Sequence, residues 1–227
     1  AQQVVELGIE QVFVATGAIW RKDGIGRTSR MPIEGLEQVA VYTPDDIMNG
    51  TVPGQGPVVI YDDDQGYLGG VLADHLSDLG HKVLFVTSAS IVSPFTELTL
   101  EQKQVQCSLV AQGVDIYTNK SIVGVSQKSG HAGVELKCVY GGQDEWLACA
   151  SLVLVTERES ASPLYEQLQQ WQKDDGTSMA MSVTLIGDAL APGLIADAVF
   201  SGHQAAQEFE ADPERRKPVS ETHLTLL

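Results

Sequence analysis

Residues 57–86 read PVVIYDDDQGYLGGVLADHLSDLGHKVLFV, and this stretch decides the fold class. It opens and closes on short, unbroken apolar runs, residues 57–61 and 83–86, which are typical of strands buried on both faces of a parallel sheet. Between the two runs, apolar side chains recur at helical spacing, and Gly80 is placed to end the helix. The stretch therefore predicts two adjacent parallel strands joined by a helix at about residues 66–79.

Strands and helices also alternate on both sides of this unit. A strand is predicted at residues 11–15. Residues 43–46 are typical of a helix start, with a Thr cap, Pro in the first position and two acids at the positive end of the helix dipole. Residues 99–112 predict a further helix that is capped by Thr99, with Gln102 completing a capping box.

Between residues 114 and 155 the pattern changes to short apolar runs separated by glycine. The runs are residues 122–125, 134–140, 146–149 and 152–155. They predict antiparallel strands that form an inserted meander. Helical character returns at residues 161–171, and a last strand at 183–186 is followed by a helix from Gly193 with one apolar face. The fold class predicted is α/β, with a Rossmann-like three-layer parallel sheet and an antiparallel meander.

The charge composition of the chain disfavours some classes of binding partner. The chain of 227 residues carries 30 acidic and 14 basic side chains, a formal net charge of −16, so nucleic acid and anionic membranes are poor partners. Its apolar runs are far shorter than the roughly 18 residues that a membrane span needs. Cys107, Cys138 and Cys149 lie far apart without a Cys-x-x-Cys pair, so neither an iron–sulfur cluster nor a zinc site is expected among them. Three separate thiols favour the reducing cytoplasm.

The loop after the strand at 57–61 occupies the place of a dinucleotide-binding fingerprint. A Gly-x-Gly-x-x-Gly turn lets the backbone approach a pyrophosphate there, but here aspartates, within Asp62 to Asp64, stand where the first two glycines belong. We interpret the loop as a nucleotide site that has been lost. Two alternatives remain open: an Asp-x-Asp metal site for phosphoryl or glycosyl chemistry, and a solvated acidic turn that caps the helix.

Two shorter motifs suit contact with a cofactor that lies across strand ends. Gly187-Asp188 follows the last strand, so that Asp188 could bind a hydroxyl while the next helix faces a phosphate. Thr16-Gly17 follows the strand at 11–15, where small residues allow close approach. The alternative is that Asp188 only caps the final helix. The five histidines show no metal spacing, and no Ser, His and Asp grouping predicts a hydrolase, so no catalytic or metal-binding residue is predicted.

Four segments carry a family resemblance. They are ATGAIWR at residues 15–21, YTPDDIM at 42–48, SLVLVT at 151–156 and LIGDALAPGLIADA at 185–198. Together they resemble the C-terminal half of the trimethylamine and histamine dehydrogenases, in a wider group that includes old-yellow-enzyme-type 2,4-dienoyl-CoA reductases. The resemblance covers the chain from residue 11 to about 210.

The resemblance implies an enzyme of three parts. An N-terminal TIM barrel holds FMN and a 4Fe-4S cluster, and two nucleotide domains built like those of glutathione reductase follow it. By this mapping residues 1–54 and 157–210 belong to the medium, FAD- or ADP-type domain. Residues 55–156 form the inserted small, NADPH-type domain, in degenerate form, and residues 211–227 form a tail. The chain is then a truncated, C-terminal part of the whole enzyme, without its catalytic centre.

The resemblance also implies a function. In the amine dehydrogenases the medium domain holds ADP, and electrons leave to an electron-transferring flavoprotein; in the reductases it holds FAD, which NADPH reduces. The acidic loop favours the dehydrogenases. Thr16, Gly17, Gly187 and Asp188 are the positions expected to contact ADP or FAD. Other expectations are a homo-oligomer and contact with the barrel of the same chain. The alternatives are a reductase that uses FAD and NAD(P)H, and a non-enzymatic interaction or scaffold module.

Overall fold

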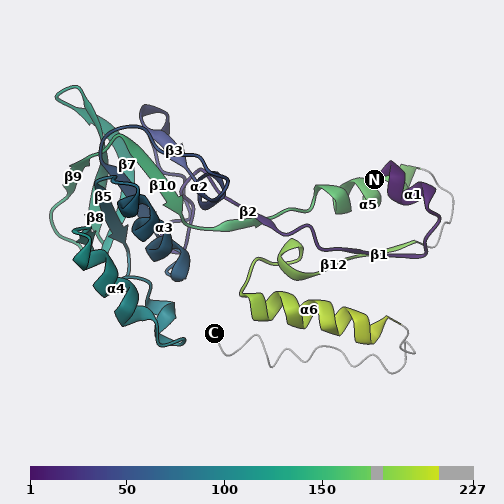
Figure 1. Ribbon diagram of the computed structural model, residues 1–227. Helices are drawn as coiled ribbons and strands as arrows, with labels where there is room; N and C mark the ends of the chain where they lie inside the picture. The colour runs from purple at the N-terminus through teal and green to yellow at the C-terminus, as the bar shows by residue number, and fades with distance from the viewer. Residues whose placement is uncertain (175–180, 210–227) are drawn as a thin grey trace. The chain divides into compact units, whose positions relative to one another are not determined.

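The computed structural model describes residues 1–174 and 181–209, and within them the chain forms two compact units (Figure 1). Unit 1 consists of residues 1–19 and the described residues from 159 onward, and unit 2 consists of residues 20–158. The chain passes between the units in β2 (Ala18–Trp20) and β11 (Arg158–Ser160), which form a two-stranded sheet. The predicted tail, residues 211–227, lies outside the described residues.

The centre of unit 2 is a five-stranded parallel sheet in the order β3-β10-β4-β5-β6. In chain order, its strands are β3 (Ala40–Tyr42), β4 (Val58–Asp62), β5 (Val83–Thr87), β6 (Asp115–Tyr117) and β10 (Ser151–Val155). β4 and β5 lie side by side and parallel, joined by α3 (Tyr67–Asp78), and Gly80 follows that helix with φ 85°. The predicted β-α-β unit is therefore confirmed.

The two faces of this sheet are covered differently. Helices cover one face (Figure 1), and a three-stranded antiparallel sheet covers the other. The covering elements are α2 (Pro44–Met48), α3, α4 (Gln102–Ala111), β7 (Lys120–Lys128), β8 (His131–Cys138) and β9 (Glu145–Ala148). Alternate residues of the parallel strands face the two sides: Ile60 packs among the helices, whereas Tyr61 packs against the antiparallel sheet. Burial on both faces explains the unbroken apolar runs.

The prediction for residues 152–155 was wrong. This run is not part of the meander, because β10 lies in the parallel sheet between β3 and β4. All five residues of β10 are buried. The run SLVLV has the same both-faced apolar character as β4 and β5, which a strand of an antiparallel sheet with one exposed face would lack.

The predicted domain boundary between residues 54 and 55 also differs from the structure. Contacts place residues 20–54 in unit 2, since β3 pairs with β10 and both Ile33 and Ile47 are buried in its core. The second boundary lies between residues 158 and 159, two residues beyond the predicted one. The pairing of β3 with β10, a strand far along the chain, decides where the segment 20–54 packs.

Local helix signals had mixed outcomes. The start of α2 is as predicted, with Thr43 and Asp46 forming a reciprocal capping box. The predicted cap of α4 was wrong: this helix begins at Gln102 after Glu101, and the Thr99 hydroxyl donates to the Thr96 carbonyl at 3.1 Å. The side-chain amide of Gln102 instead donates to the Val92 carbonyl and to the Gln106 side chain. Two short 3-10 turns, residues 36–38 and 94–97, complete unit 2.

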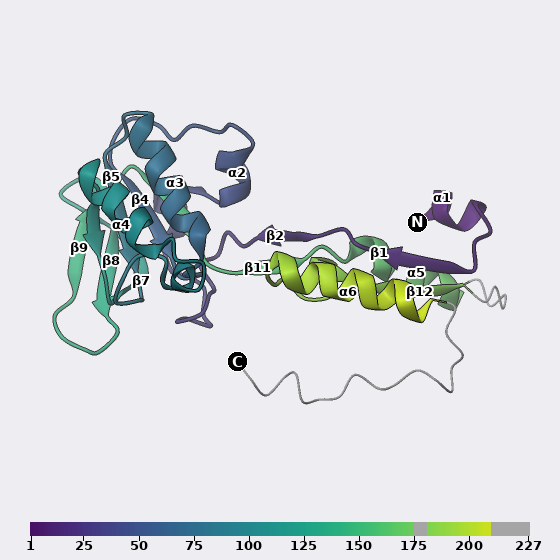
Figure 2. The same ribbon diagram turned by 60° about the horizontal axis from the view of Figure 1, so that its bottom comes forward.

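Unit 1 has a smaller core around a parallel pair of strands, β1 (Gln11–Val14) and β12 (Ser182–Leu185) (Figure 2). Its helices are α1 (Gln2–Glu6), α5 (Pro163–Asp174), α6 (Ile195–Glu208) and the 3-10 turn η3 (Gly187–Ala189). The described core centres on Val14, Leu168 and Met181. Within the described residues no side chain of α6 is buried, so its predicted apolar face is open, with Ile195 79% exposed.

Candidate functional site

The four predicted site residues all lie in unit 1, at one edge of its sheet. β1 and β12 pair in parallel, with Val14 opposite Leu185, so their carboxyl ends meet at the same edge. The Ile186 amide extends the pairing by donating to the Val14 carbonyl at 3.0 Å. Thr16-Gly17 follows one strand and Gly187-Asp188 follows the other. The structure therefore brings the two motifs to the carboxyl edge, where open α/β sheets bind ligands.

On the first of these strands, the Thr16-Gly17 turn is tied to the segment after β11. Gly17 has φ 77°, in the left-handed region that favours glycine, and its carbonyl accepts the Ala161 amide at 2.9 Å. The Thr16 hydroxyl donates to the Ala161 carbonyl. Thr16 itself is exposed and Gly17 half-buried. The turn therefore has a defined shape, and the exposed Thr16 remains accessible to a ligand.

The Gly187-Asp188 motif forms the turn η3. Gly187 has φ 59°, and its amide donates to the Ser201 hydroxyl of α6 at 3.0 Å. The half-buried Asp188 carboxylate accepts the Gly193 amide at 3.2 Å and so braces the loop between η3 and α6. The alternative in which Asp188 caps the last helix was wrong. That role belongs to Asp197, whose carboxylate accepts the Leu194 amide at 2.7 Å.

In unit 2, the acidic loop lies at the equivalent edge of the larger sheet. β4 continues through α3 to β5 on one side, whereas its neighbour on the other side is β10. The carboxyl ends of β4 and β10 therefore flank a topological switch point, where doubly wound sheets bind nucleotides. Here the loop bridges the two strands, because the amides of Asp63 and Asp64 both donate to the Val155 carbonyl, at 2.9 and 3.0 Å.

The acidic loop is not solvated. Asp62 and Asp63 are fully buried, so the interpretation of the loop as a solvated turn was wrong. The Asp63 carboxylate accepts the Thr28 amide at 2.8 Å, the Thr28 hydroxyl at 2.7 Å and the Ser88 hydroxyl at 2.7 Å. These donors come from segments far from the loop in sequence, so sequence patterns alone had no signal for them.

Asp62 is the least satisfied member of the loop. Its Oδ1 accepts the Gln65 amide at 2.9 Å, whereas its Oδ2 is buried without a hydrogen-bond partner. Burial raises the pKa of Asp62 well above the ordinary value, and the nearby charges of Asp64 and Asp63 raise it further. Burial also raises the pKa of Tyr61, to about 12, with a smaller contribution from Asp63. The loop therefore favours a neutral Asp62.

The other alternative for this loop was a metal site. Across residues 1–174 and 181–209, no group of three or more His, Cys, Asp or Glu side chains is arranged to hold a metal ion. The carboxylate of Asp63 is instead surrounded by hydrogen-bond donors of the protein. The described residues thus give no support to metal chemistry at the loop.

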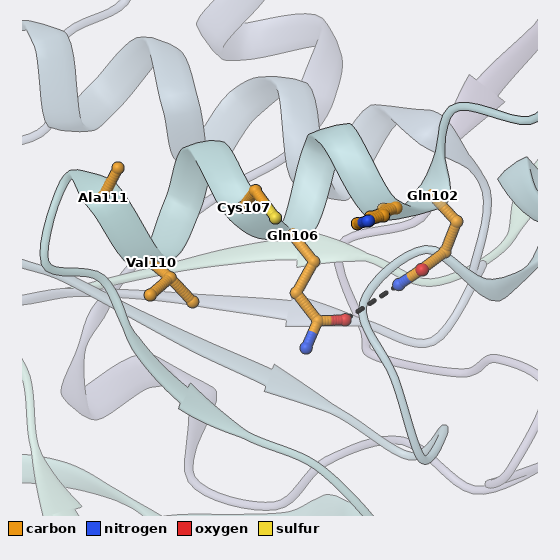
Figure 3. Close-up of a pocket in the computed structure, with 6 residues that line it drawn as sticks. Gln102, Gln106, Cys107, Val110 and Ala111 are labelled. Atoms are coloured by element: carbon orange, nitrogen blue, oxygen red, sulfur yellow. Dashed lines mark hydrogen bonds between the residues drawn. The ribbon is translucent and has the colours of Figure 1, made fainter.

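A separate surface depression lies along α4 (Figure 3). Its lining residues are Gln102, Lys103, Gln106, Cys107, Val110 and Ala111. All of them belong to one helix, and the Gln102 amide donates to the Gln106 side chain at 2.8 Å. Ligand sites bring polar groups together from several elements, which this depression does not do, so we assign no function to it.

Comparison with known proteins identifies the family. Residues 42–156, about half of the chain, match the family model described as OYE-like second alpha/beta domain. The chain belongs to this family. Dimethylamine dehydrogenase from Hyphomicrobium sp. (strain x) is 31% identical over 238 residues, which cover 96% of this chain and 32% of that protein. The resemblance to the amine dehydrogenases is confirmed.

Solved structures of similar proteins agree with the assignment of this chain to the family. Histamine dehydrogenase from Rhizobium sp. 4-9 is 36% identical with a TM-score of 0.87, over 96% of this chain and 33% of that one. A flavoprotein disulfide reductase from Escherichia coli is 20% identical with a TM-score of 0.58, over 91% of this chain and 45% of that one. The latter is a likeness of fold, and it confirms the predicted architecture of disulfide-reductase nucleotide domains. The chain spans about a third of the length of its amine dehydrogenase relatives.

Both of these relatives above 30% identity are named as amine dehydrogenases. Among the described residues, no helix is long and apolar enough to cross a membrane.

Proposed function

We propose that this chain forms the nucleotide-domain region of an FMN- and 4Fe-4S-dependent amine dehydrogenase that passes electrons to an electron-transferring flavoprotein. The observation that supports it best is the acidic loop of unit 2, whose buried aspartates stand where the fingerprint of an NADPH site would bind phosphate. The names of the two amine dehydrogenase relatives support an amine as the substrate class.

Unit 1 is proposed to bind ADP or FAD at the carboxyl edge of β1 and β12. Gly17 and Gly187 lack a Cβ there, and a Cβ built on either would meet no atom closer than 3.6 Å, so both turns leave room for a ligand. Asp188 is half-buried at the same edge and is proposed to accept a ribose hydroxyl, with Thr16 lining the other strand end. Bound FAD would supply electron transfer, whereas ADP would serve as a structural ligand.

The remaining parts of the proposal concern the longer protein. FMN and the 4Fe-4S cluster are proposed to bind in an N-terminal TIM barrel that packs with these units. Cys107 is exposed on α4 and Cys149 is buried just after β9, so the cysteines of this chain do not fit a cluster. A cytoplasmic homo-oligomer is proposed for the assembled enzyme.

The test of the proposal uses the full-length gene product. ADP or FAD should copurify in stoichiometric amount, and Asp188→Ala should weaken its binding by about tenfold, a loss typical of one polar contact. Glu208→Ala is the matched control, because this carboxylate lies at the other end of α6, where it accepts the Gln204 side-chain amide, and its loss should leave binding unchanged. Retention of full nucleotide affinity in Asp188→Ala would show that the binding elements are misplaced.

Two other functions make different predictions. A reductase of the 2,4-dienoyl-CoA type requires NADPH to bind and to reduce a flavin. A scaffold module requires no flavin in the full-length protein, and the open apolar face of α6 would then serve association. The visible absorption spectrum, before and after addition of NADPH or an amine, separates the three functions.

A further inference from the structure

The structure aligns the dinucleotide fingerprint with residues 64–69, which run from the acidic loop into α3. Gly66 is the N-cap residue of α3, the place of the second fingerprint glycine. Gly69 lies in the first turn of α3, where an added Cβ would come within 2.7 Å of the Asp62 Cγ, so it provides the close helix–strand packing of the third glycine. Residues 64–69, DQGYLG, therefore depart from Gly-x-Gly-x-x-Gly at Asp64 alone.

The side chain of Asp64 lies where this fingerprint would place a phosphate. Its Oδ2 is 2.6 Å from the position of a Cβ added to Gly66. The carboxylate thus lies at the N-terminus of a 12-residue helix, which favours a negative charge. Burial raises the pKa of Asp64, and the positive charge of Arg158, interaction with the Gly66 backbone amide and the positive charge of Arg27 oppose this rise.

A second observation at the same helix end is a buried carboxyl oxygen without a hydrogen-bond partner. The carboxyl group of Asp62 lies against Gly69 in the first turn of α3, and its Oδ2 is fully buried without a partner. Unpaired buried polar atoms are rare in folded proteins. One polar atom beside the N-terminus of α3 therefore lacks a hydrogen-bond partner.

From these observations we infer that Asp64 is the specificity-determining residue of unit 2. Its carboxylate occupies the anion position at the N-terminus of α3 and thereby excludes the diphosphate of a dinucleotide. The inference deepens the proposed function, in that it rests on unit 2 being a dinucleotide domain that no longer takes NADPH. Replacement of this one side chain opens the position to a diphosphate.

The experiment compares the full-length protein with Asp64→Gly and Asp64→Asn by calorimetry against inorganic pyrophosphate and NADPH, at one fixed ionic strength. Asp64→Gly completes the fingerprint and should bind pyrophosphate at least tenfold more tightly than the unmodified protein. Asp64→Asn removes the charge but keeps the side-chain volume, so a smaller gain is expected, and it supplies a second variant if the glycine substitution impairs folding.

Asp115→Asn is the matched control, because it removes one negative charge at the start of β6, at the opposite, amino edge of the same sheet. Its pyrophosphate affinity should equal that of the unmodified protein. Folded Asp64 variants that bind no better than Asp115→Asn would overturn the inference. Absence of ADP and FAD from every variant would count against the proposed function alone, whereas micromolar NADPH binding by the unmodified protein would overturn both.

Discussion

Thr28 and Asp63, which lie 35 positions apart, are joined by two hydrogen bonds: the Thr28 amide donates to Oδ2 at 2.8 Å and its hydroxyl to Oδ1 at 2.7 Å. Ser88 supplies a third donor to the same carboxylate. Three donors allow the carboxylate of Asp63 to remain buried at the end of the central strand. This pair fastens the segment around Thr28 to the acidic loop of unit 2.

Thr28→Val should therefore destabilise unit 2. The substitution keeps the shape of the side chain but removes one donor from a buried carboxylate, which costs about 1–3 kcal/mol. Urea unfolding followed by circular dichroism measures the loss. Thr51→Val, at an exposed position of the same unit, is the control and should change the free energy of unfolding by less than about 0.5 kcal/mol. Equal effects of the two substitutions would contradict the role given to Thr28.

Asp62→Asn should alter the pH dependence of stability. The folded-state pKa of Asp62 is raised above its ordinary value of 3.8, so its contribution is fully present below pH 3.8 and is lost as pH rises toward the folded pKa. Asparagine resembles the neutral acid and does not titrate. The stability of Asp62→Asn relative to the unmodified protein should increase by up to about 1.4 kcal/mol for each pH unit in that window.

Urea titrations at several pH values from 4 upward test this prediction for Asp62. Carboxyls away from the loop, including Asp23 and Asp46 with lowered pKa values, titrate equally in both proteins, so the difference reports Asp62 together with the loop carboxyls coupled to it. A constant difference in stability across the series would show that Asp62 titrates in the folded protein as it does in the unfolded chain.

Gly69→Ala should strain the contact between α3 and β4. A Cβ at this position would lie 2.7 Å from the Asp62 Cγ and 2.9 Å from its Cβ, so the helix must move away from the strand. Overpacking of this kind costs about 1–3 kcal/mol. Gly54→Ala in the same unit meets no atom within 4 Å and should leave the midpoint of thermal unfolding nearly unchanged. A Gly69→Ala protein as stable as Gly54→Ala would disprove the close approach.

NADPH should not bind to the unmodified protein. The loop amides of Asp63 and Asp64 are already used by the Val155 carbonyl, and the Asp64 carboxylate stands at the helix end. Calorimetric titration up to roughly millimolar NADPH should give only heats of dilution, since a site without phosphate donors loses the main part of its affinity. A micromolar dissociation constant would refute this interpretation of the acidic loop.

The sequence predicted elements whose signals are local. The β4-α3-β5 unit follows from two apolar runs, one helical period and Gly80, and the start of α2 follows from the capping residues 43–46. Thr99 carried a similar local signal, and the prediction was nevertheless wrong: α4 begins at Gln102, whose side-chain amide donates to the Val92 carbonyl and to Gln106 one turn along the same helix. Residue patterns alone do not distinguish between two neighbouring positions for the start of a helix.

For the candidate site, the sequence identified the right segments but not their surroundings. Thr16-Gly17 and Gly187-Asp188 were predicted as strand ends, and the parallel pairing of β1 with β12 brings them to one edge. The spacing of Gly66 and Gly69 fits the last two glycines of the fingerprint, and the structure supports this register by placing Gly69 against Asp62.

By itself, the sequence determined the class of fold, the central β-α-β unit, the motifs at the strand ends and the resemblance to the amine dehydrogenases, because all of these depend on residues close together in the chain. Only the tertiary structure decided that residues 151–155 lie in the parallel sheet, that residues 20–54 pack with unit 2 and that the aspartates of the loop are buried. Each of these outcomes depends on partners from distant segments. A strand takes its neighbours from hydrogen bonds across the sheet, and a buried carboxylate requires donors such as Thr28 and Ser88 that only folding brings within reach.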